Sequence, residues 1–194
     1  MILLYGSGSF AKELHSLMVV KCMCVRMVNT IESDMIENLC NSHIILASGK
    51  PSIKMSMMNE INEFNPKFYK ISFSNDVYST YGSGTVISLG AVVAPGCSIK
   101  EHILINYNAS IGHDVVVEDY STIGPNAFIG GNCEIGYASY IGAGSCIKEK
   151  TIIGNNVIIG MGAVVLKDVP DNSVVIGNPG KIFSLEEWNR NKNG

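Results

Sequence analysis

Residues 105–135, INYNASIGHDVVVEDYSTIGPNAFIGGNCEI, carry isoleucine or valine at every sixth position, and the same column runs from Ile87 to Val165 without an insertion or an exception. A glycine often follows the column residue, and a small residue usually stands four positions after it. A helix repeats about every 3.6 residues and a strand alternates every two, so neither explains a period of six. A fixed hexapeptide repeat is typical of a parallel β-helix.

The period also predicts how such a solenoid is built. Short strands alternate with tight corners, so three hexapeptides close a triangular coil of about 18 residues, and the coils stack about 4.8 Å apart. The isoleucine and valine column fills the interior. Glycine and other small residues turn the corners, where a larger side chain would clash. The length of the column predicts about four to five coils.

Residues 1–70 lack the hexapeptide and alternate between strand-like and helix-like segments, which predicts a small Rossmann-like parallel α/β domain. We expect strands at Ile2–Tyr5, Val25–Val28, Ile44–Ala47 and Phe68–Phe73, with helices ending near Val20, spanning about Ser33–Asn41, and running from Pro51 to about Phe64. The predicted organisation is an α/β domain at 1–74, a β-helix at 75–183 and a tail at 184–194. The tail is either a short helix that closes the solenoid or a disordered end.

Composition narrows the class of protein. The 194 residues carry a net charge of −3 and no basic tract, which argues against nucleic acid or an anionic membrane as a partner. No apolar run approaches the roughly 20 residues that span a bilayer. The cysteines lack the spacing of a zinc site, and the repeat contains no histidine besides His102 and His113, so we expect no metal. The expected compartment is the cytoplasm.

The turn Gly6-Ser7-Gly8-Ser9-Phe10-Ala11 follows the first predicted strand and opens the first predicted helix. A glycine-rich turn in this place can hold a phosphate at the helix N-terminus. Gly6, Gly8 and Ser9 are therefore candidate contacts for a nucleotide or a nucleotide sugar, with a purely structural turn as the alternative. A dinucleotide fold would place an acidic residue after the second strand. Val28 and Asn29 stand there, which argues against a nicotinamide or flavin cofactor.

His113 has the most informative setting of the histidines. It follows Ile111 by two positions, so it faces outward with Asp114 beside it, and coils of about 18 residues stack it between Pro95 and Gly131. This arrangement offers a general base, a carboxylate that orients it and a backbone N–H for a developing oxyanion, which are the components of acyl transfer from a thioester. The alternative is a polar histidine that faces a neighbouring subunit. We expect His102, stacked between Gly84 and Tyr120, on the surface or in a contact.

Several segments carry a family resemblance. The stretch 105–114 (INYNASIGHD) is joined by 141–145 (IGAGS), 160–165 (GMGAVV), 167–171 (KDVPD) and 177–181 (GNPGK). Together they resemble the NeuD/PglD-type sugar acyltransferases of the hexapeptide-repeat superfamily, over nearly the whole chain. The resemblance implies a left-handed β-helix, a homotrimer, and transfer of an acetyl group from acetyl-CoA to the amino group of a nucleotide-linked amino sugar in surface-glycan biosynthesis.

The resemblance also implies roles for the residues of the catalytic segment. His113 would be the general base, Asp114 would orient it, and Asn106 would contact the acceptor sugar. The backbone N–H of Gly131 would hold the thioester carbonyl. Thr122 stands where many members carry a second histidine that contacts the acyl group or the sugar.

The cofactor would bind in a groove between adjacent prisms of the trimer. The resemblance implies that the CoA arm follows the backbone around Gly142, Gly160 and Ala163, with Lys181 near the CoA phosphates. Transfer would be direct, without an acyl-enzyme. Two alternatives remain open: the same site could acetylate a sugar hydroxyl, which Thr122 in place of histidine favours, or the chain could be a non-catalytic trimeric assembly or nucleotide-sensing protein.

Overall fold

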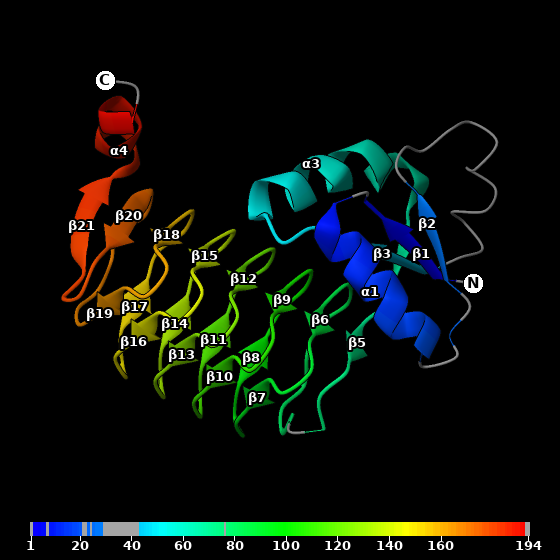
Figure 1. Cartoon of the computed structure of the whole chain (residues 1–194), viewed down its shortest axis with the longest axis horizontal. Coiled ribbons are helices and arrows are strands. Elements are labelled where there is room, and N and C mark those ends of the chain that lie inside the picture. Colours follow the sequence, from blue (N-terminus) through cyan, green and yellow to red (C-terminus); the bar gives the residue numbers. More distant parts are fainter. Residues whose placement is uncertain are drawn as a thin grey trace.

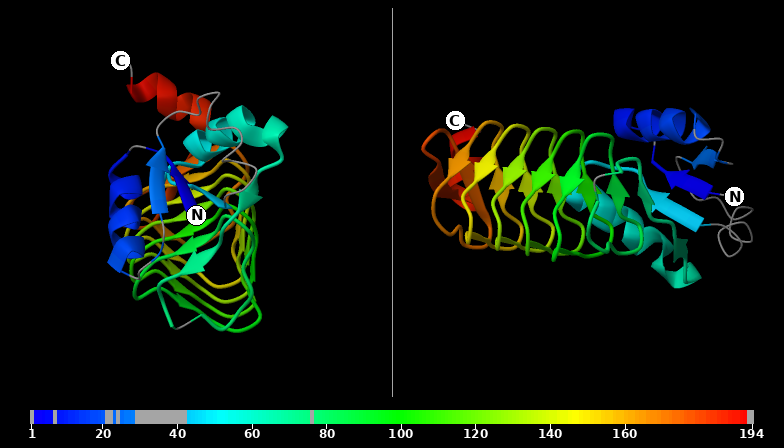
Figure 2. Two further views of the ribbon diagram at one scale, coloured as in Figure 1. Left: turned by 90° about the vertical axis from the view of Figure 1, so that its right-hand side faces the viewer. Right: turned by 90° about the horizontal axis from the view of Figure 1, so that it is seen from below.

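The computed structural model describes residues 2–6, 8–20, 23, 25–28, 43–75 and 77–192. A small α/β domain lies against one end of a long parallel β-solenoid, and the C-terminal helix lies at the other end (Figure 1). The views in Figure 2 show the coils stacked along one axis. The helix predicted at Ser33–Asn41 lies outside the described residues.

The α/β domain has a parallel sheet in the order β2-β1-β3-β4. Its elements are β1 (Ile2–Tyr5), α1 (Ser9–Val20), β2 (Val25–Val28), β3 (His43–Leu46), α3 (Pro51–Ile61), the 3₁₀ helix η2 (Asn62–Phe64) and β4 (Lys67–Phe68). Alternate residues of the buried strands point to opposite faces. Leu4 and Ile45 pack with α1, whereas Leu3 and Ile44 pack in a separate cluster with Met57 of α3. The described elements therefore contain the parallel sheet that the sequence predicts, with α1 and α3 packed against it.

The expected strand Phe68–Phe73 is wrong, because the chain changes sheets within it. The N–H of Tyr69 still donates to Ile44 O in the α/β domain, at 2.9 Å. The N–H of Ile71 donates to Thr85 O at 3.0 Å, and β5 (Ile71–Ser72) pairs with β6 (Val86–Ile87) of the solenoid. A single strand cannot serve both sheets, so two short strands flank a bend.

The solenoid consists of two-residue strands separated by tight corners. These are β6, β7 (Val92–Val93), β8 (Ser98–Ile99), β9 (Leu104–Ile105), β10 (Ser110–Ile111), β11 (Val116–Val117), β12 (Thr122–Ile123), β13 (Phe128–Ile129), β14 (Glu134–Ile135), β15 (Tyr140–Ile141), β16 (Cys146–Ile147), β17 (Ile152–Ile153), β18 (Ile158–Ile159) and β19 (Val164–Val165). After them come β20 (Ser173–Ile176), β21 (Lys181–Ser184) and α4 (Leu185–Lys192).

The strands form three faces. Face 1 contains β7, β10, β13, β16 and β19; face 2 contains β8, β11, β14 and β17; face 3 contains β5, β6, β9, β12, β15, β18 and β20, with β21 added antiparallel at its end. We name the edges by one residue each. The Asn106 edge joins face 3 to face 1, the His113 edge joins face 1 to face 2, and the His102 edge joins face 2 to face 3.

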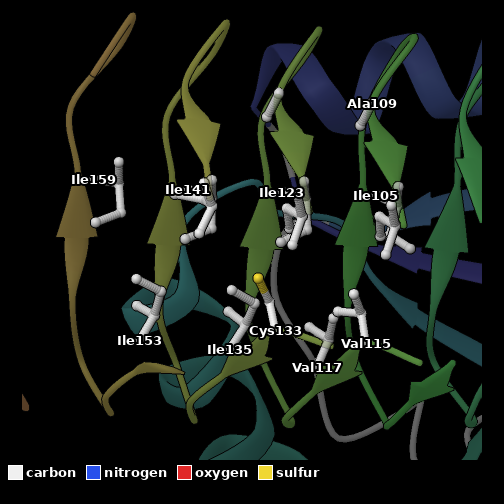
Figure 3. Packing of buried hydrophobic residues seen from close by; sticks show 14 of the residues in the cluster. Ile105, Ala109, Val115, Val117, Ile123, Cys133, Ile135, Ile141, Ile153 and Ile159 are labelled. Carbon is white, nitrogen blue, oxygen red and sulfur yellow. The ribbon is translucent and has the colours of Figure 1, made fainter. Parts of the chain in front are cut away.

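The isoleucine and valine column lies inside the solenoid, as predicted. Ile105, Ile123 and Ile141 pair in register on face 3 and are fully buried (Figure 3). Full burial of such a side chain contributes about 1.5–3 kcal/mol. Each rung repeats the same apolar contact, so the column accounts for most of the core cluster.

The solenoid has about six turns, so the prediction of four to five was too low. Before the regular repeat, β5 pairs with β6 while Val77 and Tyr81 bridge to Val93 and Ile99. After it, Val169 bridges to Ile153, and β20 pairs with β18. These outer turns lack the regular six-residue spacing, which is why the sequence pattern misses them. At the far end the tail forms the helix α4, one of the two alternatives that the sequence left open, and α4 contacts β20 and β21.

Candidate active site

The backbone of two neighbouring coils holds the His113 corner. Asp114 N–H donates to Pro95 O at 3.1 Å, and Asn132 N–H donates to His113 O at 2.8 Å. Asp114 has a φ of 57°, in the left-handed region that aspartate tolerates better than most residues. The predicted stacking of His113 between Pro95 and Gly131 is therefore present.

The side chains of His113 and Asp114 face one another. His113 Nδ1 lies 2.8 Å from Asp114 Oδ2, and the two side chains are 64% and 59% exposed. An exposed pair of this kind contributes little to stability. A carboxylate without a proton only accepts hydrogen bonds, so toward it Nδ1 is the donor; in the tautomer with the proton on Nδ1, Nε2 has a free lone pair. The pair therefore orients Nε2 as a base.

Gly131 lies against that basic nitrogen. A Cβ at residue 131 would lie 2.7 Å from His113 Nε2, closer than real Cβ contacts come. Within the part of the chain that the structure describes, no acceptor takes the Gly131 N–H. The corner thus combines an accessible base with a donor one coil away, and this combination suits a reaction that removes a proton while an oxyanion forms.

The residues implied for the arm and phosphates of CoA lie away from His113. Gly142, Gly160 and Ala163 stack along the Asn106 edge, across face 1 from His113. Their N–H groups donate within the solenoid, at 2.8 Å to Ile159 O, 2.7 Å to Val175 O and 3.2 Å to Gly160 O respectively. The carbonyl oxygens of the same three residues also accept hydrogen bonds, from the N–H groups of Ser145, Ala163 and Cys146 respectively. Both the amides and the carbonyls of this edge therefore already serve the solenoid. Lys181 is exposed at the start of β21.

The two residues implied for sugar binding also lie away from His113 within one chain. Asn106 is half-buried on its own edge, and its Oδ1 accepts the Tyr107 N–H at 2.8 Å. Thr122 is 2% exposed on face 3, and among the described residues its Oγ1 has no hydrogen-bond partner. Nine residues are half of an 18-residue coil, so Thr122 points to the side opposite His113.

A cavity of about 1170 Å³ lies between the α/β domain and the solenoid. On one side it is lined by the turns that open α1 and α3, including the predicted contacts Gly6, Gly8 and Ser9. On the other side lie Tyr140 of face 3 and Ala138 of the His102 edge. Two helix N-termini at one cavity favour an anionic ligand such as a phosphate.

Local packing explains why residue 6 is glycine. Its φ is +143°, and a Cβ there would lie 2.7 Å from Ala47 O of the neighbouring strand end. Only glycine allows the β1–α1 turn to approach β3 this closely. The turn therefore opens toward the cavity at the carboxyl ends of two parallel strands, which is where such sheets usually bind ligands.

Comparisons with known proteins support a chemical class. No family model matches the sequence, and no curated protein matches it. Solved structures do match. The acetyltransferase domain of PglB from Neisseria gonorrhoeae is 25% identical, with a TM-score of 0.85 over 94% of this chain and 98% of that chain. The same domain in complex with acetyl coenzyme A gives a TM-score of 0.84 over the same shares of the two chains, again at 25% identity. The chain is a hexapeptide-repeat acyltransferase.

Two further structures share the fold of this acyltransferase. WeeI from Acinetobacter baumannii is 24% identical, with a TM-score of 0.83 over 94% of this chain and 99% of that chain. PerB from Caulobacter crescentus, in complex with CoA and GDP-perosamine, is 20% identical, with a TM-score of 0.82 over 94% of this chain and 97% of that chain. The solenoid therefore matches a left-handed β-helix, as the resemblance implied.

The acyltransferase also has polar groups that the sequence did not reveal as part of a site. In the cavity, the Tyr5 hydroxyl bonds to the Glu60 carboxylate. Burial, followed by the effect of Glu60, raises the pKa of Tyr5 to about 12. Tyr5 and Glu60 are 55 positions apart in the sequence, and the signal that could have found them is the end of β1 packing beside α3.

His102 is a domain contact and not a surface residue. Its side chain is 3% exposed, stacks with Tyr120 at 5.0 Å and meets Phe68 edge-on at 4.3 Å. The predicted neighbours Gly84 and Tyr120 are present, but Phe68 and Lys54 of the α/β domain cover His102. Burial, then the nearby Lys54, lowers the pKa of His102 to about 4, against a smaller opposing effect of Asp119.

Across the described residues, the acyltransferase has no group of three or more His, Cys, Asp or Glu side chains that could hold a metal ion. Within those same residues, no helix has the length and apolar character needed to cross a membrane.

Proposed function

We propose that the chain is an acetyl-CoA-dependent N-acetyltransferase that acts on the amino group of a nucleotide-linked amino sugar, in the cytoplasm, for surface-glycan biosynthesis. The observation that carries the proposal is the His113–Asp114 pair, with Nε2 beside Gly131. The likeness to the PglB acetyltransferase domain, solved with acetyl coenzyme A, supports the acyl donor.

His113 is the general base of the proposed reaction. Nε2 takes a proton from the amino group as the nitrogen attacks the thioester carbonyl, and Asp114 stabilises the imidazolium that forms. The Gly131 N–H donates to the carbonyl oxygen as it becomes an oxyanion. The C–N bond then forms fully, the C–S bond breaks, and the proton on His113 passes to the departing CoA sulfur.

Direct transfer fits the cysteines better than an acyl-enzyme does. The Cys97 and Cys133 thiols are buried and donate to backbone carbonyls at 3.0 Å. Burial raises the pKa of the Cys133 thiol, which lowers its thiolate content. Cys146 is exposed on face 1, away from the His113 corner. None of these three thiols combines exposure with an adjacent base.

The homotrimer remains part of the proposal, for a geometric reason. Face 1 lies between the Asn106 edge and the His113 edge. If face 1 turns toward a three-fold axis, the Asn106 edge of each copy meets the His113 edge of the next. Phe128 on face 1 is 49% exposed, and Met161 near the Asn106 edge is 79% exposed. Both would be covered in that arrangement.

The acceptor would occupy the cavity between the domains. Its phosphates would bind at the N-terminus of α1, beside Gly6, Gly8 and Ser9, and the sugar would extend toward Asn106 and Thr122. Acetyl-CoA would follow Gly142, Gly160 and Ala163, with Lys181 near its phosphates. His113 of the adjoining copy would then reach the amino group.

The test is thiol release from acetyl-CoA with UDP-, GDP- and dTDP-linked 4-amino sugars, beside matched sugars that carry only hydroxyls. Turnover confined to the amino sugars supports the proposal. Turnover on hydroxyl sugars establishes O-acetylation instead. Full activity of the His113→Ala variant would show that His113 is not the general base. CoA binding without turnover on any acceptor contradicts the proposed acceptor class.

A second experiment tests the shared site. His113→Ala removes the base, and Ser9→Glu places a negative charge where the phosphates would bind. Each variant alone is expected to be inactive. Mixed trimers from co-expression regain activity if the base and the cavity of one site come from different copies. No recovery in verified mixed trimers contradicts that arrangement.

A further inference from the structure

Lys54 of α3 is a lysine in an unusual place. It is 2% exposed, and its Nζ donates to His102 O at 2.6 Å and to Ser121 O at 3.0 Å. These carbonyls belong to neighbouring coils on the His102 edge. No carboxylate pairs with Lys54 among the residues that the structure describes. The amine is therefore held by main-chain oxygens of the solenoid alone.

Burying a charged amine is unfavourable, and this shows in the pKa of Lys54. Loss of water lowers the pKa of Lys54 to about 7. A methionine of similar length would fill this space without that penalty. The lysine adds two directed hydrogen bonds, which an apolar side chain cannot provide. These bonds fix where α3 lies on the solenoid and how it is turned about its own axis.

That position matters because α3 is one wall of the cavity. Pro51, Ile53 and Met57 of α3 line it, whereas the facing wall belongs to the solenoid. The coil that Lys54 binds lies directly beside the facing wall, since Ser139 N–H donates to Ser121 Oγ at 3.1 Å and Ser139 stands between Ala138 and Tyr140. Lys54 therefore joins the two walls close to the cavity without lining it.

We infer that Lys54 is a positioning residue for the acceptor cavity. By tying α3 to two adjacent coils, it holds the α3 wall at a fixed distance from Ala138 and Tyr140. The inference rests on the proposed function only in taking a nucleotide-linked amino sugar as the occupant. Acetyl-CoA is proposed to bind at the Asn106 edge, so Lys54 acts on one substrate and not on the other.

The experiment is Lys54→Met in the full-length protein. Without the two hydrogen bonds, α3 shifts or rocks, and we expect KM for the nucleotide-linked amino sugar to rise about tenfold. KM for acetyl-CoA and kcat should stay within about twofold, because the two carbonyls that Lys54 binds lie on the His102 edge, whereas His113 and the proposed acetyl-CoA site lie on the other two edges. Amide hydrogen exchange should quicken across 52–61, a readout that does not require turnover.

Lys70→Met is the matched control. Lys70 Nζ also donates to a solenoid carbonyl, Tyr81 O at 2.8 Å, but Lys70 is exposed and lies outside the cavity lining. The Lys70→Met variant should leave the KM values for both substrates unchanged. If Lys54→Met does not fold, Lys54→Gln keeps an NH₂ donor and should give a smaller rise in acceptor KM.

The outcomes separate the two proposals. Wild type that turns over no nucleotide-linked amino sugar refutes the proposed function, and hydrogen exchange in Lys54→Met then still tests the anchoring of α3. Wild type that is active, with unchanged acceptor KM in Lys54→Met, overturns the positioning role. Equal rises in both KM values, or the same rise in Lys70→Met, also overturn it, because they indicate general loosening of the fold.

Discussion

Gly131→Ala adds one methyl group next to the proposed base. The new Cβ would lie 2.7 Å from His113 Nε2 and 3.0 Å from Cδ2 and Cε1, whereas ordinary contact begins at 3.4 Å. The imidazole must therefore retreat by about 0.7 Å or turn away from its place. The residue lies outside the left-handed region, so alanine adds no backbone strain. The imidazole is mostly exposed and can move, and we expect the fold to survive.

We expect this displacement of the imidazole to slow the chemical step. A misplacement of about 1 Å can lower a rate about 10²-fold, and a general base is worth about 10²–10⁴-fold. We expect kcat to fall on the order of 10²-fold, with a melting temperature close to that of the wild type. The assay is thiol release at saturating substrates. Glu149→Ala is the control, because Glu149 occupies the equivalent exposed corner position one coil further on.

A double-variant comparison decides whether the methyl acts through His113. In a His113→Ala background the methyl has no ring to displace, so Gly131→Ala should cost almost nothing more. Full activity in the single variant would refute the steric argument. An undiminished further loss in the double variant would show that Gly131 acts by another route, such as a changed oxyanion contact.

The remaining predictions concern the core, the turn and the junction. Ile129→Asp buries a charge inside the solenoid and should abolish folding, whereas Phe128→Asp on the exposed side of the same strand should still fold; a folded Ile129→Asp protein would contradict the register. Gly6→Ala should destabilise the α/β domain in thermal melts, while Gly8→Ala, which has open space around it, should not; equal effects would contradict the close approach of Gly6 to β3. Because folding lowers the pKa of Lys54 from 10.5 to about 7, the unfolded chain binds more protons between these values, so stability should rise with pH across that window and be lost as pH falls toward 7. Lys54→Met should remove this rise in pH-dependent melts, and an unchanged slope would show that Lys54 is not the group responsible. His102, with a pKa lowered from 6.5 to about 4, should cause a further loss of stability as pH falls through that lower range.

Features that repeat along the chain could be predicted from sequence. The column Ile105, Ile123, Ile141 defines the interior, and the coil length alone places Gly131 beside His113. Features outside the regular repeat could not be predicted in this way. Val77 and Tyr81 form part of a coil without the hexapeptide pattern, because single bridges to Val93 and Ile99 are enough to continue the stack.

Contacts between the two domains also could not be predicted from the sequence. Lysine is amphipathic and usually exposed, so nothing local in the sequence marks Lys54 as buried. Its burial depends on how α3 docks against the His102 edge, which is set by apolar contacts of the whole domain. The same docking explains why His102 is buried and why the strand expected at 68–73 divides between two sheets.

The solenoid's rigidity constrains how the proposed site can assemble. Residues separated by one coil stack on one edge, so Asn106 and Gly142 share a column, and His113 and Gly131 share another. The two columns lie at opposite sides of face 1, and paired strands with a close-packed interior do not bend to bring them together. A reaction that uses both columns needs them to meet across an interface between copies. We therefore expect that weakening the contacts of face 1 removes activity without unfolding the chain, because the proposed homotrimer would lose the site shared between its copies.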